Sequence, residues 1–150
     1  MPQEENDSIR RIASHETIPL RHKILRPNMT PAECVYPGDD DTSSYHFGAF
    51  DNDALIGIVS LMPEKSPHSD TSSSYRLRGM AVEPHLQGKG IGKQIVECVL
   101  KTLRDDGIKL IWCNARTHAI PFYERCAFKV VGEEFDIPHI GPHFVAQIEL

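Results

Sequence analysis

The segment that most constrains this chain runs from Met80 to Gly92 and reads Met-Ala-Val-Glu-Pro-His-Leu-Gln-Gly-Lys-Gly-Ile-Gly. An extended apolar run over residues 75–82 leads through a proline-containing turn into alternating glycines, and an amphipathic helical pattern follows at once. Glycine lets a backbone approach a ligand closely, and the first turn of a helix offers unpaired N–H groups with partial positive charge. Lys89 and Lys93 lie there although each opposes the helix dipole by about 0.3–1 kcal/mol. The segment therefore predicts a binding site for a phosphate or pyrophosphate group.

Two familiar phosphate-binding loops do not fit this spacing. A Walker loop needs one more residue between its glycines than separates Gly88 from Gly92, and it needs Ser or Thr where Gln94 stands. A dinucleotide fingerprint reads Gly-x-Gly-x-x-Gly, which the glycines at 88, 90 and 92 do not satisfy. The pattern that fits is Gln/Arg-x-x-Gly-x-Gly/Ala, met by Gln87, Gly90 and Gly92.

This pattern resembles the coenzyme-binding loop of the GNAT superfamily of acyl-CoA-dependent N-acetyltransferases. A second segment, Ala119-Ile-Pro-Phe-Tyr-Glu-Arg-Cys-Ala-Phe128, resembles the GNAT pattern Ala-x-x-Leu-Tyr-Glu-Lys-x-Gly-Phe. Two departures stand out: Ala127 replaces the usual glycine, and Arg116 replaces a frequent asparagine, although Asn114 is close by. The two signatures, about thirty residues apart, make a stronger match than either alone.

Length and composition agree with one soluble globular domain. We expect residues 1–150 to form a single domain of this superfamily, with residues 1–7 disordered. No apolar run approaches the ~20 residues that a membrane helix needs, and the acidic start does not resemble a secretory signal. The net charge of −5 argues against a nucleic-acid partner. Four scattered cysteines without a C-x-x-C pair favour free thiols and a cytoplasmic location.

The pattern of apolar residues predicts a mixed α/β protein. The expected fold class is α/β (an α+β mixed sheet), a GNAT-type acyltransferase fold in which helices flank a central, mostly antiparallel mixed sheet. The strands at 75–82 and 108–113, joined by a helix, should be parallel. Thr117 or His118 should cap the helix at 119–126. The predicted strands are 8–14, 45–50, 55–62, 75–82, 108–113, 128–131 and 144–150, and the predicted helices are 16–25, 91–106 and 119–126.

The resemblance implies acetyl-CoA as co-substrate, a small-molecule primary amine as acceptor, and no metal. It places the coenzyme pyrophosphate on the glycine loop and the pantetheine arm along the end of the 75–82 strand, where a backbone N–H of Ala81 or Val82 would bind the thioester oxygen. The cofactor-binding residues implied are Met80, Ala81, Val82, Gln87, Gly88, Lys89, Gly90, Ile91, Gly92, Lys93, Asn114, Phe122 and Tyr123.

Tyr123 takes the position of the general acid in this resemblance. A phenol with a pKa near ~10 is protonated at neutral pH and can donate a proton to the leaving thiolate. The alternative is that Tyr123 only packs between Phe122 and Phe128.

The general base and the acceptor site stay open. The central strand reads Tyr75-Arg-Leu-Arg78, without the glutamate found in many relatives, so the amine could lose its proton through water or arrive neutral. His46 is a further candidate, with a half-exposed strand histidine as the alternative. Arg76 and Arg78 suggest an acceptor with a carboxylate or phosphate, with a solvated strand face as the alternative.

Two other polar segments carry weaker signals. The histidines at 139 and 143 are four apart, but Pro138, Gly141 and Pro142 forbid the helix that would bring them together on a metal. Residues 137–143 should instead form a rigid loop, which the resemblance places at the border of the acceptor pocket. The acidic run Asp39–Asp41 reads as a solvated loop.

Two other functions compete with catalysis. The missing strand carboxylate allows a catalytically inactive acyl-CoA-binding sensor or regulatory module. The presence of Tyr123 at the general-acid position argues against this alternative. A nucleotide-binding domain unrelated to acyl transfer disagrees with the glycine spacing. A homodimer is expected by analogy with the superfamily alone.

Overall fold

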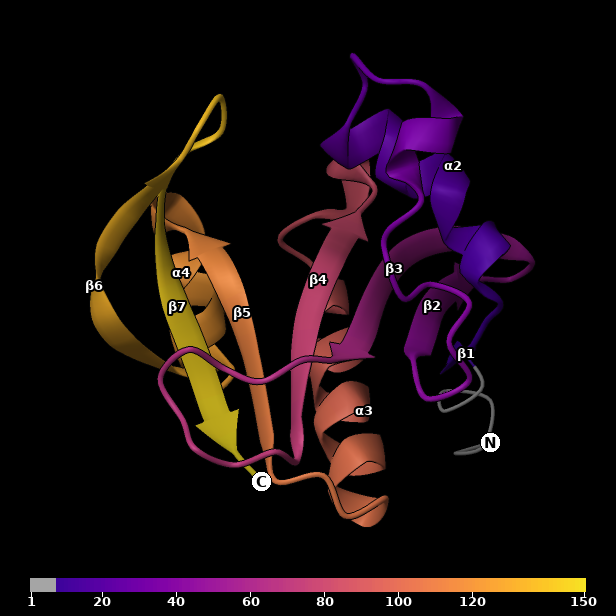
Figure 1. The fold of residues 1–150 in the computed structure, drawn as a ribbon. Coiled ribbons are helices and arrows are strands. Elements are labelled where there is room, and N and C mark those ends of the chain that lie inside the picture. Colours follow the sequence, from indigo (N-terminus) through magenta and orange to yellow (C-terminus); the bar gives the residue numbers. More distant parts are fainter. Residues whose placement is uncertain (1–7) are drawn as a thin grey trace. The chain divides into compact units, whose positions relative to one another are not determined.

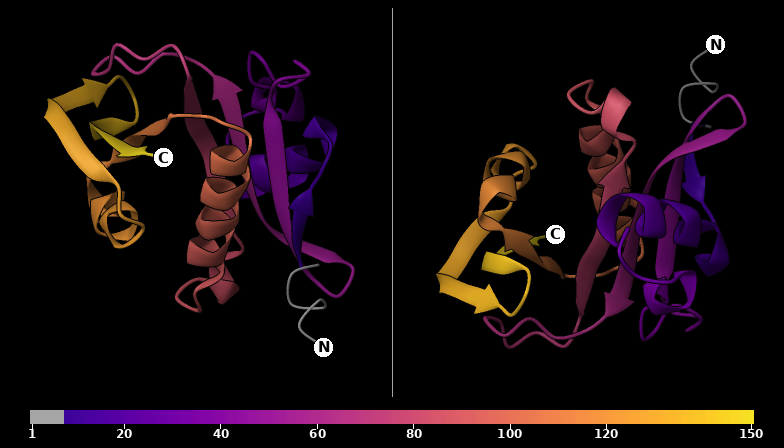
Figure 2. Two further views of the ribbon diagram at one scale, coloured as in Figure 1. Left: turned by 90° about the horizontal axis from the view of Figure 1, so that it is seen from below. Right: turned by 90° about the horizontal axis from the view of Figure 1, so that it is seen from above.

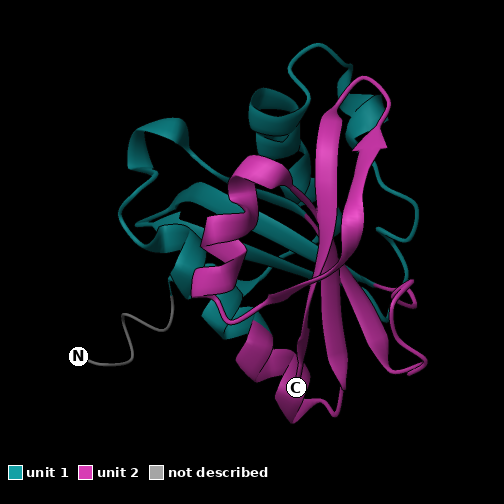
Figure 3. Cartoon of the chain, turned by 90° about the vertical axis from the view of Figure 1, so that its left-hand side faces the viewer, with its two compact units in different colours: residues 1–62, 79–99 teal, residues 63–78, 100–150 magenta. Residues whose placement is uncertain are grey.

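The computed structural model describes residues 8–150, so the predicted disorder at 1–7 lies outside the described residues (Figure 1). The chain divides into two compact units that alternate along the sequence (Figure 3). The described part of unit 1 is residues 8–62 and 79–99, and unit 2 is residues 63–78 and 100–150. The expectation of a single domain therefore stays a prediction.

Unit 1 is built on antiparallel strands. Strand β1 (Ile9–Arg11) pairs with β2 (Tyr45–Asp51), and β2 pairs with β3 (Ala54–Pro63). The residues at 79–82 are the end of β4 (Ser74–Val82), which follows β3 in the strand order. The predicted strands at 45–50 and 55–62 are confirmed, and together they form an antiparallel hairpin.

Helix α3 (Ile91–Asp105) packs in unit 1 through its apolar stripe. Ile95, Val96 and Val99 are fully buried, as the 3.6-residue periodicity predicts. A Cβ on Gly57 of β3 would lie 2.8 Å from the end of the Ile95 side chain, so a larger residue there would force Ile95 to shift.

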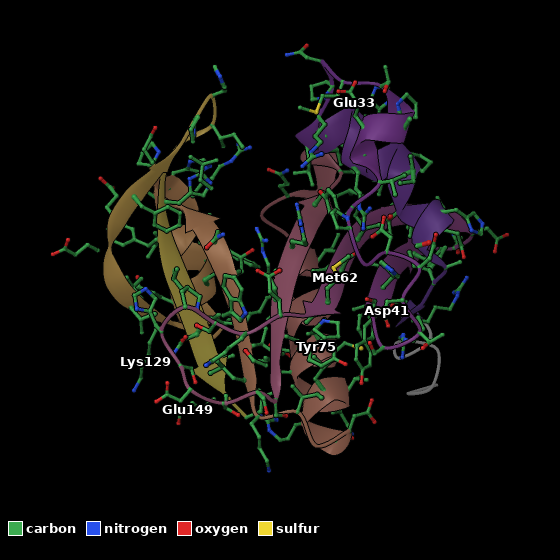
Figure 4. The ribbon with its side chains drawn as sticks, in the orientation of Figure 1. Glu33, Asp41, Met62, Tyr75, Lys129 and Glu149 are labelled. Carbon is green, nitrogen blue, oxygen red and sulfur yellow. The ribbon has the colours of Figure 1, made fainter. Side chains whose placement is uncertain are left out.

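The predicted helix at 16–25 is present but irregular. It consists of a 3-10 helix (Ser14–Thr17), α2 (Ile18–Leu20) and a π-helix (Arg21–Leu25). It ends at Arg26, which precedes a proline and so avoids helical angles. The segment that follows contains a further 3-10 helix, Pro31–Cys34, which Thr30 and Glu33 cap reciprocally (Glu33 is labelled in Figure 4).

Unit 2 combines parallel and antiparallel pairing. The start of β4 is parallel to β5 (Leu110–Arg116), which confirms the predicted crossover. Strand β7 (Gly141–Glu149) is antiparallel to both β5 and β6 (Lys129–Ile137), and the β5–β7–β6 order can be followed in Figure 2. Helix α4 (Ile120–Arg125) lies against these strands. A mixed sheet in which β4 and β5 are parallel while β1–β2, β2–β3, β5–β7 and β6–β7 are antiparallel confirms the predicted fold class.

The last hairpin differs from the prediction. Residues 137–143 do not form a rigid loop, because β6 extends to Ile137 and β7 begins at Gly141. The alternation of apolar and polar side chains over residues 144–150 suggests one dry and one wet face, yet the neighbouring Val145 and Ala146 are both buried. Strand β7 is an inner strand, paired with β5 on one edge and with β6 on the other.

The segment between β3 and β4 is anchored to unit 2. The Trp112 indole N–H donates to the Glu64 carbonyl at 2.8 Å, and the Ser66 hydroxyl donates to Gln147 at 2.8 Å. Lys129 at the start of β6 and Glu149 at the end of β7 are both exposed (Figure 4). None of the helices within residues 8–150 combines the length and hydropathy needed to cross a bilayer.

Candidate active site

The glycine loop of unit 1 leads directly into helix α3. The Gln94 N–H donates to the Gly90 carbonyl at 3.0 Å, which is the first turn of the helix. The N–H groups of Ile91, Gly92 and Lys93 precede this bond and have no acceptor within the helix. The predicted helix start at Ile91 is confirmed.

The space beside the loop glycines is open. Gly88 has φ +81° and Gly90 has φ +85°, and nothing lies within 4 Å of where a Cβ on either would be. Both conformations are left-handed, which glycine adopts without strain. Lys89 and Lys93 are exposed beside them. Free backbone donors, an open approach and two cations fit an anionic group such as a pyrophosphate.

Gln87 has a structural contact that the sequence did not reveal. Its side-chain amide donates to the carbonyl of Val82 at 3.1 Å. This bond ties the loop to the end of β4, since Val82 is the last residue of that strand. A glutamine at this position therefore fixes the loop as well as providing polar atoms.

The end of β4 is irregular and closely packed. Gly79 has φ +66°, the only positive φ value within Ser74–Val82. Ala81 and Val82 are buried and Met80 is partly exposed. The Ala81 carbonyl lies 3.4 Å from where a Cβ on Gly57 would be, so β3 and the end of β4 are in close contact within unit 1.

In unit 2, Tyr123 is held on α4 by aromatic neighbours. Its ring centroid lies 5.1 Å from that of Phe122 and 5.4 Å from that of Phe128, both edge to face. Pro121 occupies the first turn, as predicted. The predicted cap is wrong: a 3-10 helix, Thr117–Ala119, precedes α4, and the Thr117 hydroxyl donates to Glu134 at 3.0 Å.

The Tyr123 hydroxyl donates to the thiol of Cys113 on β5. Burial, followed by the neighbouring Cys113 and Cys126, raises the pKa of Tyr123 well above its usual value. Burial also raises the pKa of the Cys113 thiol to about 12. Both groups are therefore protonated at neutral pH, which suits a proton donor and equally suits a packed core.

The turn after α4 shows why glycine is common at residue 127. Ala127 has φ 73°, a left-handed conformation that is strained for alanine. The Ala127 N–H donates to the Glu124 carbonyl at 3.0 Å, and the Phe128 N–H donates to the Tyr123 carbonyl at 3.0 Å. The alanine keeps the turn closed despite the strain.

The remaining cofactor candidates of unit 2 lie on or beside β5. Asn114 and Phe122 are half-buried, and Arg116, at the usual asparagine position, is exposed. Unit 1 thus contains Met80 to Val82 and Gln87 to Lys93, and unit 2 contains Asn114, Phe122 and Tyr123.

Arg76 lies in unit 2 on the start of β4. Its guanidinium is 5.4 Å from the Trp112 ring centroid, and its Nη1 atom is 3.5 Å from a carboxylate oxygen of Glu64. The Arg76 Nε atom is buried and has no hydrogen-bond partner. Arg78 is partly exposed on the same strand.

His46 is not the half-exposed strand histidine expected from the sequence. It is 5% exposed, and its ring nitrogens lie 2.7 Å from the Ser60 hydroxyl and 2.9 Å from the Asp39 carbonyl. Asp39 likewise departs from the expected solvated acidic run, because it is buried and paired with Arg21 at 2.7 Å. Charge patterning could not reveal this, since the partners come from distant segments.

Comparisons with known proteins agree with this arrangement. The model of the acetyltransferase (GNAT) family matches residues 8–128. The chain is 36% identical over 137 residues to an uncharacterized N-acetyltransferase, YitI, of Bacillus subtilis (strain 168), covering 91% of this chain and 92% of that protein.

Solved structures share the fold at low sequence identity. An IAA acetyltransferase from Bacillus cereus ATCC 14579 matches with a TM-score of 0.69 at 22% identity, over 95% of this chain and 98% of that one. An aminoglycoside 6'-N-acetyltransferase complexed with coenzyme A matches with a TM-score of 0.75 at 14% identity, over 94% of this chain and 96% of that one. Family model, relative and fold agree: the chain belongs to the GNAT family and is an acyltransferase.

Proposed function

We propose that this protein transfers an acetyl group from acetyl-CoA to the primary amine of a small molecule. The observation that carries the proposal is the open glycine loop at the start of α3, where Gly88 and Gly90 leave room beside unpaired helix N–H groups. Family membership and the coenzyme A bound to a structural neighbour support the choice of cofactor.

The chain offers a group for each part of the coenzyme. Backbone N–H groups of residues 88–93 would bind the pyrophosphate, with Lys89 and Lys93 balancing its charge. Met80, Ala81 and Val82 would hold the pantetheine arm by strand-like hydrogen bonds. Asn114 and Phe122 would line that arm.

The proposed reaction is direct acyl transfer. Acetyl-CoA supplies a thioester carbon, at which a C–N bond forms to the amine as the C–S bond breaks. A backbone N–H of Ala81 or Val82 would stabilise the negative charge on the acyl oxygen. Tyr123 would protonate the departing sulfur, since its raised pKa keeps the proton available at neutral pH.

We place Arg76 in the acceptor site, with Arg78 as a second candidate, and leave His46 out because both of its ring nitrogens are engaged. The ion pair of Arg76 with the exposed Glu64 is long at 3.5 Å, and the Arg76 Nε donor has no partner. A guanidinium in this condition favours an acceptor that carries a carboxylate or phosphate. We propose that water, and not a side chain, removes the proton from the acceptor amine.

Four free thiols, three of them buried, support a reducing compartment such as the cytoplasm as part of this proposal. A homodimer stays a prediction, which light scattering on the purified protein would check.

Calorimetric titration with acetyl-CoA tests the proposal. We expect one-to-one binding in the micromolar range, and we expect Gly90→Glu to abolish it by blocking the backbone approach with a bulky acid. Gly107→Glu is a matched control, because Gly107 also has φ +85° and open space but follows the other end of α3. No binding by the folded wild type would refute the proposal. Binding without turnover on amino acids, polyamines, aminosugars or peptides would favour the acyl-CoA sensor instead.

A further inference from the structure

Four buried polar side chains form a closed ring in the core of unit 1. Arg21 is fully buried, and its guanidinium donates to both carboxylate oxygens of Asp39 at 2.7 and 2.9 Å. It also donates to the Ser60 hydroxyl at 2.8 Å. Ser60 in turn contacts His46 Nδ1 at 2.7 Å, and His46 Nε2 contacts the Asp39 carbonyl at 2.9 Å.

Donor and acceptor roles in this ring follow from the Asp39 carbonyl. It can only accept, so His46 Nε2 carries a proton, and in the neutral imidazole His46 Nδ1 accepts from the Ser60 hydroxyl. The Ser60 oxygen is then free to accept from Arg21. The Ser60 hydroxyl thus serves both as a donor, to His46, and as an acceptor, from Arg21.

Stability alone does not explain such a ring. Buried ion pairs are often no more stabilising than apolar side chains of the same volume, because both charges must leave water. The Arg21 Nε atom is also buried without a hydrogen-bond partner. An arrangement that tolerates an unsatisfied charged donor calls for another reason.

The reason lies in what the ring touches. The Arg21 guanidinium stacks 3.8 Å from the Tyr36 ring centroid. A Cβ on Gly79 would lie 2.9 Å from the Tyr36 ring edge and 3.5 Å from Arg21 Nε. The left-handed residue of β4 therefore rests directly on the Tyr36–Arg21 stack.

We propose that Arg21, held by Asp39 and Ser60 and stacked on Tyr36, is a positioning residue that fixes the left-handed turn of β4 at Gly79. Such a turn sets the direction of the N–H groups that follow it. Those belong to Met80, Ala81 and Val82, which the proposed function assigns to the acyl group and the pantetheine arm, and this inference rests on that function.

Ser60→Ala tests the inference with a small change at the centre of the ring. Ser66→Ala is the matched control, because Ser66 is also buried but its hydroxyl donates to Gln147 in unit 2 and to no member of the ring. Amide hydrogen exchange needs no ligand: we expect faster exchange at residues 79–82 in Ser60→Ala and wild-type rates in Ser66→Ala. If Ser60→Ala does not fold, Tyr36→Leu is used instead, because it removes the aromatic side chain that packs beneath Gly79.

Amide chemical shifts connect the effect to the proposed chemistry. Coenzyme A should shift the amides of Gly88, Gly90 and Gly92 in all variants. The difference between acetyl-CoA and coenzyme A at Ala81 and Val82 should fall at least twofold in Ser60→Ala only. Wild-type exchange and a wild-type acetyl-dependent shift in Ser60→Ala would overturn the inference. Absence of any coenzyme shift in the wild type would refute the proposed function, while the exchange result would still decide whether the ring positions β4.

Discussion

Replacement of Tyr123 by phenylalanine separates catalysis from packing. The Tyr123 ring touches Phe122 and Phe128 through its edges and faces, and phenylalanine keeps both contacts. The structural loss is the hydroxyl and its bond to Cys113, worth about 0.5–1.5 kcal/mol for a neutral hydrogen bond. For a chain of this size each kcal/mol lowers Tm by roughly 2–4 °C, so the expected fall in Tm is roughly 1–6 °C.

The catalytic loss should be much larger. Removal of a general acid lowers turnover by about 10²–10⁴-fold, and a hundredfold loss is about 2.7 kcal/mol in the barrier. We expect kcat to fall at least tenfold in Tyr123→Phe while calorimetry gives a wild-type affinity for acetyl-CoA. Because the pKa of Tyr123 is raised, its deprotonation should not reduce wild-type turnover below about pH 10.

Tyr45→Phe is the control for this experiment. Tyr45 and Tyr123 are both 8% exposed, but Tyr45 lies on β2, away from the proposed chemistry. Both variants should unfold at similar temperatures and differ in turnover. If the turnover of Tyr123→Phe is within twofold of wild type, Tyr123 is not the general acid and only packs between Phe122 and Phe128.

Three further predictions concern stability and reactivity. Burial opposes ionisation of Asp39, but bonds from Arg21 and the Tyr36 N–H outweigh it and hold the pKa of the carboxyl below its usual value. The ionised Asp39 therefore adds to the free energy of unfolding above the unfolded pKa near ~3.9, and this contribution is lost as pH falls through the folded pKa. Asp39→Asn should make the free energy of unfolding depend less on pH in the acid range, and it should lower that free energy by about 3 kcal/mol at pH 7. Ala127→Gly should relieve the left-handed strain and stabilise the protein by about 1 kcal/mol, seen as a higher midpoint in urea. Iodoacetamide at pH 8 should label the half-buried Cys98 before Cys113, whose pKa of about 12 leaves almost no thiolate; labelling in the reverse order would contradict the described burial.

The local pattern of apolar residues and glycines was enough to predict the regular helices and strands. The apolar stripe of α3 and the glycines before it predicted both the helix and its start at Ile91, because each depends on neighbours within a few residues. The parallel pairing of β4 with β5 followed from the helix between them.

The burial of side chains whose partners lie far away in the sequence could not be predicted. The burial of His46 and Asp39 arises from Arg21, 18 residues before Asp39, and from Ser60, 14 residues beyond His46. The length of β6 and β7 was also missed, because Pro138 and Gly141 look like loop residues until the hairpin around them is known. Such contacts leave no periodic signal in the chain.

The position of Trp112 has a practical consequence. It is the only tryptophan of the chain, it is 3% exposed, and its indole is bonded to the Glu64 carbonyl within unit 2. Its fluorescence therefore reports the environment of a side chain of unit 2, whereas circular dichroism averages over the helices and strands of both units. If the two signals change at one temperature the units melt together, and if the fluorescence changes first, unit 2 opens while unit 1 keeps its secondary structure.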